Sequence, residues 1–328
     1  MKLLVLGGTE FVGRAMAEEA LAEGWEVTVF NRGNHPAPAG ALALKGDRTA
    51  QGGLDALREG EWDAVVDTWS GAPRAVRDVA RLLADRAGRY AYVSSCSVYP
   101  FPAPRGNDEH GAVVEGSPDE GQRDYARDKR GAELAAVGAF GAPRTLLLRA
   151  GLILGPYENI GRLPWWLGRI AKGGDVLAPG PQALELQYID ARDLARWTLH
   201  ALRTQLHGPY NLVSAPGHTT MGELLDTCLA VTGSDARLHW TDPKVVTDAG
   251  IEPWTGLPIW LPPGEMHEAI HQSDTSKALA AGLRCRPVAE TVQDTWEWLC
   301  GIGGVAPQRP DRPVVGLDAE AEAAVLNR

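Results

Sequence analysis

The first 32 residues constrain the fold more than any other stretch of the chain. An apolar run from Lys2 to Leu6 stops at Gly7-Gly8, and apolar residues then recur at helical spacing from Phe11 to Ala22. Residues 26–30 alternate as a second strand does, so the stretch predicts one right-handed βαβ unit. The helix N-terminus of such a unit faces the carboxyl edge of the strands, where backbone N–H groups favour a phosphate.

The turn between this strand and helix has the composition of a dinucleotide site. Gly7, Gly8 and Gly13 would let a diphosphate approach the backbone, whereas Glu10 occupies the position of the usual middle glycine. An ordinary glycine-rich turn in an unrelated α/β protein is the alternative. The residues that we expect to bind the cofactor here are Gly7, Gly8, Thr9, Glu10, Phe11, Val12 and Gly13.

Residues after the second expected strand bear on the choice of dinucleotide. Asn31 and Arg32 stand where an acidic residue would hold the ribose 2′-hydroxyl of NAD. Because a planar guanidinium suits a phosphate, Arg32 favours NADP(H), with NAD(H) as the alternative cofactor; a solvated surface arginine is the simpler interpretation. Asp47, which follows a third strand at 42–45, is a candidate acceptor for the adenine amino group.

Composition excludes several classes of function. The 328 residues are 44% hydrophobic, enough for a large core in one or two domains. A net charge of −10 without a basic run argues against a nucleic-acid partner, and no stretch approaches the ~18 apolar residues of a membrane span. Four isolated cysteines suit reduced thiols, so we expect a cytoplasmic protein. We also expect a small-molecule substrate and leave a homodimer open.

Strands and helices alternate through the first half of the chain. We expect further strands at 62–68, 90–94 and 144–149, and helices at 73–87 and 122–140. This alternation predicts an α/β fold with a doubly wound parallel sheet, whose ligands lie beyond the carboxyl ends of the strands.

Three polar side chains are expected at that edge of the sheet. Tyr125 and Lys129 lie one helical turn apart and share a face, and a nearby ammonium group favours the phenolate that acid–base catalysis uses. Taken alone, such a pair is more often a surface pair. Ser95 ends a preceding strand, which predicts that it lies near the pair and the glycine-rich turn.

Four motifs follow one another along the chain: GGTEFVG at 7–13, SSCSVY at 94–99, YARDK at 125–129 followed by Glu133, and QYIDARDLA at 187–195. Together they resemble the extended short-chain dehydrogenase/reductase family, also called the epimerase/dehydratase family. The resemblance implies a Rossmann domain with Tyr125 as catalytic acid/base, Lys129 as the group that binds the nicotinamide ribose, and Ser95 as the group that holds the substrate oxygen. Glu10 departs from the family pattern.

The second half of the chain alternates less regularly and predicts a smaller C-terminal substrate lobe. It contains a hairpin-like GGDVLAPGPQ segment at 173–182 and an amphipathic helix at 221–232. The expected divisions are a Rossmann domain in 1–152 plus 186–213, a lobe in 153–185 plus 214–304, and a linker with a C-terminal helix in 305–328.

Residues of the lobe bear on the substrate. The family's nucleotide-sugar enzymes carry an asparagine after the strand that follows the catalytic helix, and an arginine two residues before the position matched by Tyr188. This chain has no asparagine there before Asn159, and it has Leu186 at the second position. Arg162 and Arg169 are the cations that could still reach a phosphate.

Four tryptophans suggest a different kind of pocket. Trp165, Trp166, Trp254 and Trp260 could line an apolar site, or they could cover the core of the lobe. We therefore expect an NAD(P)-dependent oxidoreductase that reduces a ketone, aldehyde or imine. A nucleotide-sugar epimerase or dehydratase and a non-catalytic NADP(H)-binding protein are the alternatives.

A competing motif belongs to another enzyme class. His267, Glu268 and His271 satisfy HExxH, in which a helix presents two histidines to zinc. No histidine follows Cys285 as a third ligand, and residues 266–274 could equally form a short strand before a helix at 275–281. We expect no metal site.

Overall fold

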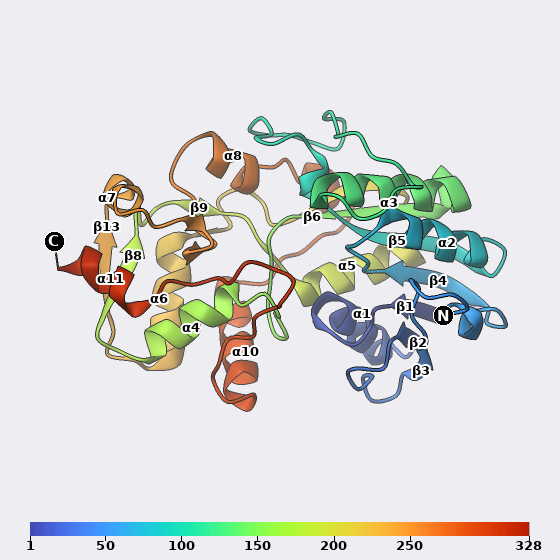
Figure 1. The fold of residues 1–328 in the computed structure, drawn as a ribbon, viewed down its shortest axis with the longest axis horizontal. Helices are drawn as coiled ribbons and strands as arrows, with labels where there is room; N and C mark the ends of the chain where they lie inside the picture. Colours follow the sequence, from blue (N-terminus) through green and yellow to red (C-terminus); the bar gives the residue numbers. More distant parts are fainter. Residues whose placement is uncertain (328) are drawn as a thin grey trace.

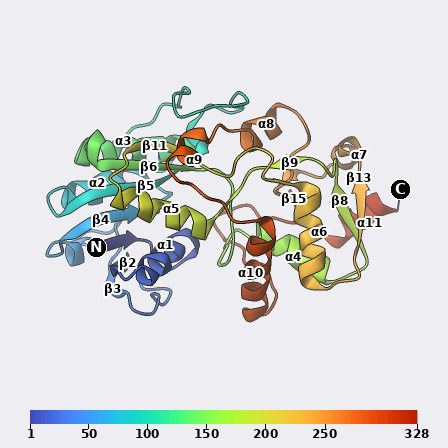
Figure 2. The same ribbon diagram turned by 180° about the vertical axis from the view of Figure 1, so that it is seen from behind.

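The computed structural model describes residues 1–327 and has the expected doubly wound α/β fold with a smaller C-terminal lobe (Figures 1 and 2). All seven strands of the main sheet are parallel, in the order β11-β6-β5-β4-β1-β2-β3. The strands are β1 (Lys2–Leu6), β2 (Glu26–Asn31), β3 (Leu42–Lys45), β4 (Trp62–Asp67), β5 (Ala87–Ser95), β6 (Thr145–Ala150) and β11 (Gly208–Leu212).

Helices cover both faces of this sheet, which explains the continuous apolar runs of its strands. In β1, Leu3 and Val5 pack on the face covered by α1 (Phe11–Ala22) and α5 (Ala191–Arg203). Leu4 and Leu6 pack on the opposite face, under α2 (Pro73–Leu83) and α3 (Tyr125–Phe140). The reversal of strand order beside β1 places the ends of β1 and β4 at the point where such folds bind ligands.

Two helix boundaries differ from the sequence expectation. The helix expected from residue 122 begins at Tyr125, because the Asp124 side chain accepts from the backbone N–H of Arg127 and caps it. Tyr125 is thereby the first helical residue. The helix expected to run to residue 87 ends at Leu83, since Ala87 already belongs to β5.

The smaller lobe is built around its own core. Helices α4 (Arg162–Ala171), α6 (Met221–Thr232) and α10 (Val288–Gly301) pack together there. The hairpin expected at 173–182 is wrong: β8 (Asp175–Pro179) pairs in parallel with β13 (Arg237–Thr241), about 60 residues later. The glycines and prolines of the segment bound one strand, and its partner comes from elsewhere in the chain.

Short elements complete the lobe and its junction with the sheet. Residues 265–271 form a helix, so of the two possibilities left open for the HExxH motif, the short strand is wrong. The short helices are α7 (Pro243–Asp248), α8 (Glu265–His271) and α9 (Ser276–Ala280). The short strand pairs are β7 (Ile153–Leu154) with β10 (Ile189–Asp190), β9 (Glu185–Leu186) with β12 (Thr219–Thr220), and β14 (Pro253–Trp254) with β15 (Leu257–Pro258).

The C-terminal residues return to the body of the protein. After α10 the chain runs back between lobe and sheet and then to α11 (Ala319–Leu326) at the far end of the lobe (Figure 1). Glu322 fixes α11 there, because its carboxylate accepts from Arg169 Nε at 2.7 Å and from the backbone N–H of Leu177 at 3.0 Å.

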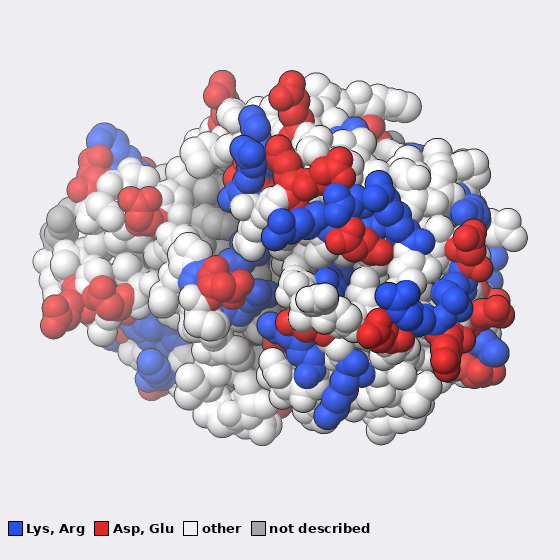
Figure 3. Space-filling model, turned by 45° about the vertical axis from the view of Figure 1, so that its right-hand side comes forward, with Lys and Arg blue, Asp and Glu red and all other residues white. Residues whose placement is uncertain are grey.

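On the face in Figure 3, Lys and Arg are interspersed with Asp and Glu, so this face carries no extended patch of one sign. Among the helices within residues 1–327, none is both long enough and apolar enough to cross a membrane.

Candidate functional site

A cavity of about 920 Å³ lies at the carboxyl edge of the sheet, between the sheet and the lobe. Its walls come from the glycine-rich turn after β1, the ends of β4 and β5, the start of α3, and the lobe residues around Asn159 and Trp254. All the candidate cofactor and catalytic residues except Gly8 line it. The convergence expected at this edge is therefore present.

The glycine-rich turn has the shape of a cradle that side chains would fill. A Cβ on Gly13 would lie 2.2 Å from the carbonyl oxygen of Gly7, and one on Gly7 (φ +97°) would lie 2.4 Å from Thr68 Oγ1. Gly8 points away from the cavity, against Val29. The turn leads into the N-terminus of α1, so its residues fit the diphosphate of a dinucleotide.

Glu10 is the N-cap residue of α1 and lines the cavity. Its side chain makes no cap hydrogen bond; instead its carboxylate accepts from Asn159 Nδ2 at 3.3 Å and lies 3.6 Å from His35 Nε2. The residue that departs from the family pattern therefore places a carboxylate beside the cradle.

The residues after β2 and β3 meet at one end of the cavity. The Asp47 carboxylate accepts from the backbone N–H and the hydroxyl of Thr49, at 2.9 and 2.6 Å, and these hydrogen bonds lower the pKa of Asp47. Arg32 lies near enough to lower that pKa further. The exposed Arg32 has no ion-pair partner within residues 1–327, so it stays available to a phosphate.

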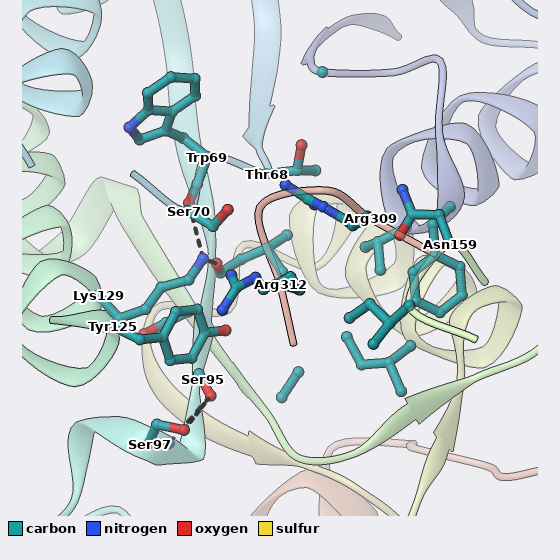
Figure 4. Close-up of a pocket in the computed structure, with 18 of the residues that line it drawn as sticks. Thr68, Trp69, Ser70, Ser95, Ser97, Tyr125, Lys129, Asn159, Arg309 and Arg312 are labelled. Atoms are coloured by element: carbon teal, nitrogen blue, oxygen red, sulfur yellow. Dashed lines mark hydrogen bonds between the residues drawn. The ribbon is translucent and has the colours of Figure 1, made fainter. Parts of the chain in front are cut away.

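Tyr125, Lys129 and Ser95 lie together at the other end (Figure 4). The Tyr125 side chain, 38% exposed, stands on the cavity wall, and Lys129 Nζ lies 5.8 Å from the centre of its ring. Ser95 Oγ is 3.1 Å from Ser97 Oγ and accepts from the backbone N–H of Ser97. The serine hydroxyl faces the cavity from the end of β5, near Tyr125 and Lys129. It is therefore placed where the predicted hydrogen bond to a substrate oxygen requires it.

Lys129 is only 3% exposed, and its ammonium group donates to the carbonyl oxygens of Val93 and Trp69 at 2.6 and 2.8 Å. Burial lowers the pKa of Lys129 to about 7; Asp67 and Glu133 act against this shift, and Arg312 adds to it. The side chain is therefore anchored at the ends of two strands and changes charge near neutral pH.

A buried polar network holds the ends of β5 and β6 against α3. The fully buried Glu133 carboxylate accepts from Ser94 Oγ at 2.8 Å, from Arg149 Nε at 2.9 Å and from Arg130. Arg149 donates in turn to the Tyr99 hydroxyl at 3.0 Å. Because the network ties the strand that carries Ser95 to the helix that carries Tyr125 and Lys129, it sets the spacing of the three groups.

A second buried pair holds the loop after β3. Arg48 donates twice to the fully buried Asp67 carboxylate, both at 3.0 Å, and the Tyr90 hydroxyl donates to the same group at 2.5 Å. This bidentate pair fixes Asp47 relative to the end of β4.

The structure adds two arginines and an asparagine that the sequence analysis did not place in the site, and it places Arg162, one of the two cations considered there, in the same cavity. Arg309 and Arg312, from the segment expected to be a linker, line the cavity, and the Arg312 guanidinium lies 5.1 Å from the Tyr125 ring centre. Asn159 and Arg162 also line it. No motif marks these four, because tertiary packing alone brings them to the cavity.

Arg162 and Arg312 have no ion-pair partner within residues 1–327. Arg162 lies 5.3 Å from the Trp254 ring centre, and its buried Nε has no hydrogen-bond partner. The neighbouring Glu158 is fully buried, which raises the pKa of its carboxyl to about 7, so it carries only part of a charge near neutrality. Unlike Arg162, Arg169 lies outside the cavity, paired with Glu322.

The tryptophans divide between core and cavity. Trp166 and Trp260 are fully buried, and their indole N–H groups donate to the carbonyl oxygens of Pro258 and Gly180. Trp165 packs on the same core. Of the four, for which a pocket or the lobe core was left open, only Trp254 lines the cavity.

The HExxH histidines bond to the backbone. His267 Nε2 lies 2.8 Å from the carbonyl oxygen of Glu185, and His271 Nδ1 accepts from the N–H of Gln187 at 3.0 Å. Residues 1–327 contain no group of three or more His, Cys, Asp or Glu side chains placed to hold a metal ion. Both imidazoles connect α8 to the strand segment at 185–187.

Comparisons with known structures identify the fold. The Bordetella bronchiseptica enzyme WbmH, solved with NAD+, superposes with a TM-score of 0.67 at 17% identity, over 93% of this chain and 99% of that one. Thermus thermophilus UDP-glucose 4-epimerase, solved with NAD, gives 0.64 at 20% identity, over 92% and 99%. Bacillus cereus UDP-N-acetylglucosamine 4-epimerase gives 0.65 at 16% identity, over 90% and 98%. A comparison with curated protein sequences found no match.

A sequence profile identifies the family. The profile of the NAD dependent epimerase/dehydratase family matches residues 3–212, about two thirds of the chain. This region holds the glycine-rich turn, Ser95, Tyr125 and Lys129, the residues on which the resemblance was based. The chain therefore belongs to the NAD-dependent epimerase/dehydratase family.

Proposed function

We propose that this protein is a nucleotide-sugar epimerase or dehydratase that works with NAD(P) at the site around Tyr125. The observation that carries the proposal concerns two arginines in the cavity that contains Tyr125. Arg162 and Arg312 have no salt-bridge partner within residues 1–327. A cation in a partly buried site is stabilised by an anion at salt-bridge distance, which an anionic substrate group would supply. A sugar linked to a nucleoside diphosphate carries such a group.

Other features support the same substrate class. Asn159 lines the cavity, although it lies later in its segment than the asparagine of the family's nucleotide-sugar enzymes. Leu186, at the position of their arginine, is buried and supplies no charge. Arg162 and Arg312 bring positive charge from other parts of the chain instead.

The chemistry assigned to the chain's own residues is proton transfer and positioning. Tyr125 takes the proton from a substrate hydroxyl as that carbon is oxidised, and returns it at the end of the cycle. Ser95 donates a hydrogen bond to the same oxygen, and Lys129, anchored by two carbonyl oxygens, holds its amino group beside the Tyr125 ring. NAD(P) bound at the glycine-rich turn supplies hydride acceptance and return.

The reduction of a small apolar carbonyl compound is the second candidate. It rests on the apolar part of the wall, where Trp254, Ile270 and Val315 line the cavity. The expectation of a reductase depended on four tryptophans, but all four belong to the lobe core or pack on it, and only Trp254 also lines the cavity. The family and the arginines favour the epimerase instead.

A substrate screen separates the candidates. The purified protein, supplied with NAD+ or NADP+, is incubated with UDP- and dTDP-sugars, and product epimers are followed by NMR. In parallel, NADPH oxidation is followed with a panel of ketones, aldehydes and imines. We expect micromolar binding and interconversion of a nucleotide sugar without net cofactor turnover, and we expect this activity to be absent in Tyr125→Phe.

The opposite results define the alternatives. Steady NADPH oxidation by a hydrophobic carbonyl compound, without binding of any nucleotide sugar, would establish the reductase. Tight cofactor binding without turnover of either panel would indicate a non-catalytic binding protein.

A further inference from the structure

The segment between α10 and α11 forms a closed loop over the cavity. Two hydrogen bonds join its ends: Val315 N–H donates to Gln308 Oε1 at 3.1 Å, and Gln308 Nε2 donates to the Val315 carbonyl oxygen at 3.3 Å. Next to this closure, Gly316 N–H donates to the Thr255 carbonyl oxygen at 2.7 Å. We call residues 308–315 the C-terminal loop.

The loop is packed directly on the wall of the site. A Cβ on Gly161, the N-cap residue of α4, would lie 2.5 Å from the Pro307 carbonyl oxygen and 2.6 Å from Gln308 Nε2. One on Gly316 would lie 2.1 Å from Trp165 Nε1. Because the loop backbone is held at both ends, the side chains of the residues between these ends have a defined direction.

The two arginines of the loop extend into the cavity. Arg309 and Arg312 both line the cavity; Figure 4 shows Arg309 between Thr68 and Asn159, and Arg312 beside Tyr125 and Lys129. Thr68 contacts the glycine-rich turn through the close approach of its Oγ1 to Gly7, and Asn159 donates to Glu10. Arg309 therefore stands next to the cradle, whereas Arg312 stands next to the catalytic tyrosine.

Arg309 keeps one guanidinium nitrogen without a hydrogen-bond partner within residues 1–327. Its Nε and Nη2 donate to the Asp311 carboxylate at 2.9 and 2.6 Å, while Nη1 has no hydrogen-bond partner within residues 1–327. The hydrogen bond to Asp311 raises the pKa of Arg309 against the effect of burial, and the charge of Glu10 contributes in the same direction. Asp311 orients the guanidinium, and Glu10 lies within electrostatic range of it.

The charges explain why the site needs this loop. A dinucleotide diphosphate at the N-terminus of α1 would lie beside the Glu10 carboxylate, which repels it. The loop contains two arginines, which line the same cavity, and one aspartate, so it has a net charge of +1 that opposes the charge of Glu10. Neutral glycine at the middle position would require no such compensation.

We infer that the C-terminal loop is part of the cofactor site: Arg309 binds the diphosphate of the dinucleotide and offsets the charge that Glu10 places at the glycine-rich turn. The loop lies outside residues 3–212, which the family profile matches. The inference concerns cofactor binding and does not depend on which substrate the enzyme converts.

A binding experiment with ADP-ribose tests the inference, because this probe contains the diphosphate but lacks the nicotinamide. Arg309→Gln should weaken ADP-ribose and NAD+ binding about tenfold by calorimetry, the order expected for one partly screened charge pair. Arg309→Lys should retain most of the affinity. Adding Glu10→Gln to Arg309→Gln should recover much of the loss, since the uncompensated carboxylate is then removed.

A matched control separates this effect from the general loss of an ion pair. Arg237 forms the same bidentate pair with Asp175 on the surface of the lobe, away from the cavity, so Arg237→Gln should bind ADP-ribose as the natural protein does. Circular dichroism of each variant confirms its fold.

A second arm tests whether the arginine serves the substrate instead. UDP is titrated into protein saturated with NAD+, and its affinity should change less than about twofold in Arg309→Gln. Unchanged ADP-ribose affinity in Arg309→Gln would overturn the inference, as would a loss confined to UDP. Failure to epimerise any sugar would refute the proposed function but leave these binding results intact.

Discussion

Lys129 gives a prediction whose size follows from its burial. The unfolded chain holds the lysine proton up to the ordinary pKa of 10.5, whereas the folded protein releases it near pH 7. Between these values the unfolded state binds more protons, so the contribution of this group to the free energy of unfolding rises with pH. The whole difference corresponds to about 5 kcal/mol, of which about 2 kcal/mol develops between pH 7 and 9.

The assay is urea unfolding of the cofactor-free protein and of Lys129→Met at pH 7, 8 and 9. The natural protein should gain about 2 kcal/mol relative to Lys129→Met over this range, because the variant has no proton to release at this site. Other titrating groups cancel in the difference. Lys172→Met, at the exposed C-terminal end of α4, is the control and should show no such trend.

A difference between the natural protein and Lys129→Met that does not change with pH would refute the reasoning. It would mean that Asp67 and Glu133 hold the ammonium charged throughout, and that they outweigh the burial and the repulsion from Arg312. Lys129 would then act in the site as a permanent cation.

Three further variants test the candidate residues. Tyr125→Phe should lower turnover by a factor of about 10² to 10⁴, the usual contribution of acid–base catalysis, while cofactor affinity measured by fluorescence stays unchanged; full activity would exclude Tyr125 as the acid/base. Arg32→Ala should weaken NADP(H) far more than NAD(H) in the same titration, and NADH binding as tight as NADPH by the natural protein would contradict the preference. Elemental analysis should find no stoichiometric zinc, whereas one zinc per chain that is lost in His267→Ala would support the hypothesis of a zinc enzyme at the HExxH motif.

The sheet domain could be predicted from sequence because its signals are local. Leu3 to Leu6 are apolar without interruption because helices cover both faces of β1, and the same holds for most of the central strands. Parallel strands bring their carboxyl ends to one edge, so Gly7, Ser95 and the start of α3 had to lie near one another. Boundaries were less exact, since the cap formed by Asp124 decided where α3 begins.

The lobe could not be predicted in the same way because its pairings are distant. β8 pairs with a strand about 60 residues later, and no local pattern distinguishes that arrangement from a hairpin. The tryptophans show the same limit for the site. The sequence shows that large apolar side chains are present. Only packing determines that Trp166 and Trp260 fill the core of the lobe and that Trp254 lines the cavity.

The substrate expectation changed because charge depends on position as well as number. Arg162 and Arg169 were equivalent in the sequence, seven residues apart on one helix. In the structure Glu322 neutralises Arg169 at the far end of the lobe, while Arg162 faces the cavity without an ion-pair partner within residues 1–327. Only the unpaired arginine can attract an anionic substrate.

The two ends of the chain also have to be considered together. Glu10, read alone, is a defect in a glycine motif, and residues 306–313, read alone, are a proline- and arginine-rich linker. The fold brings them to one cavity, although they are some 300 residues apart in sequence. Asn159 is bonded to Glu10, and the C-terminal loop is packed on Gly161. If Arg309 compensates Glu10, the two departures are one adaptation, and a chain that regains the middle glycine has less need of the arginine. The recovery of affinity in the Glu10→Gln, Arg309→Gln double variant measures that coupling directly.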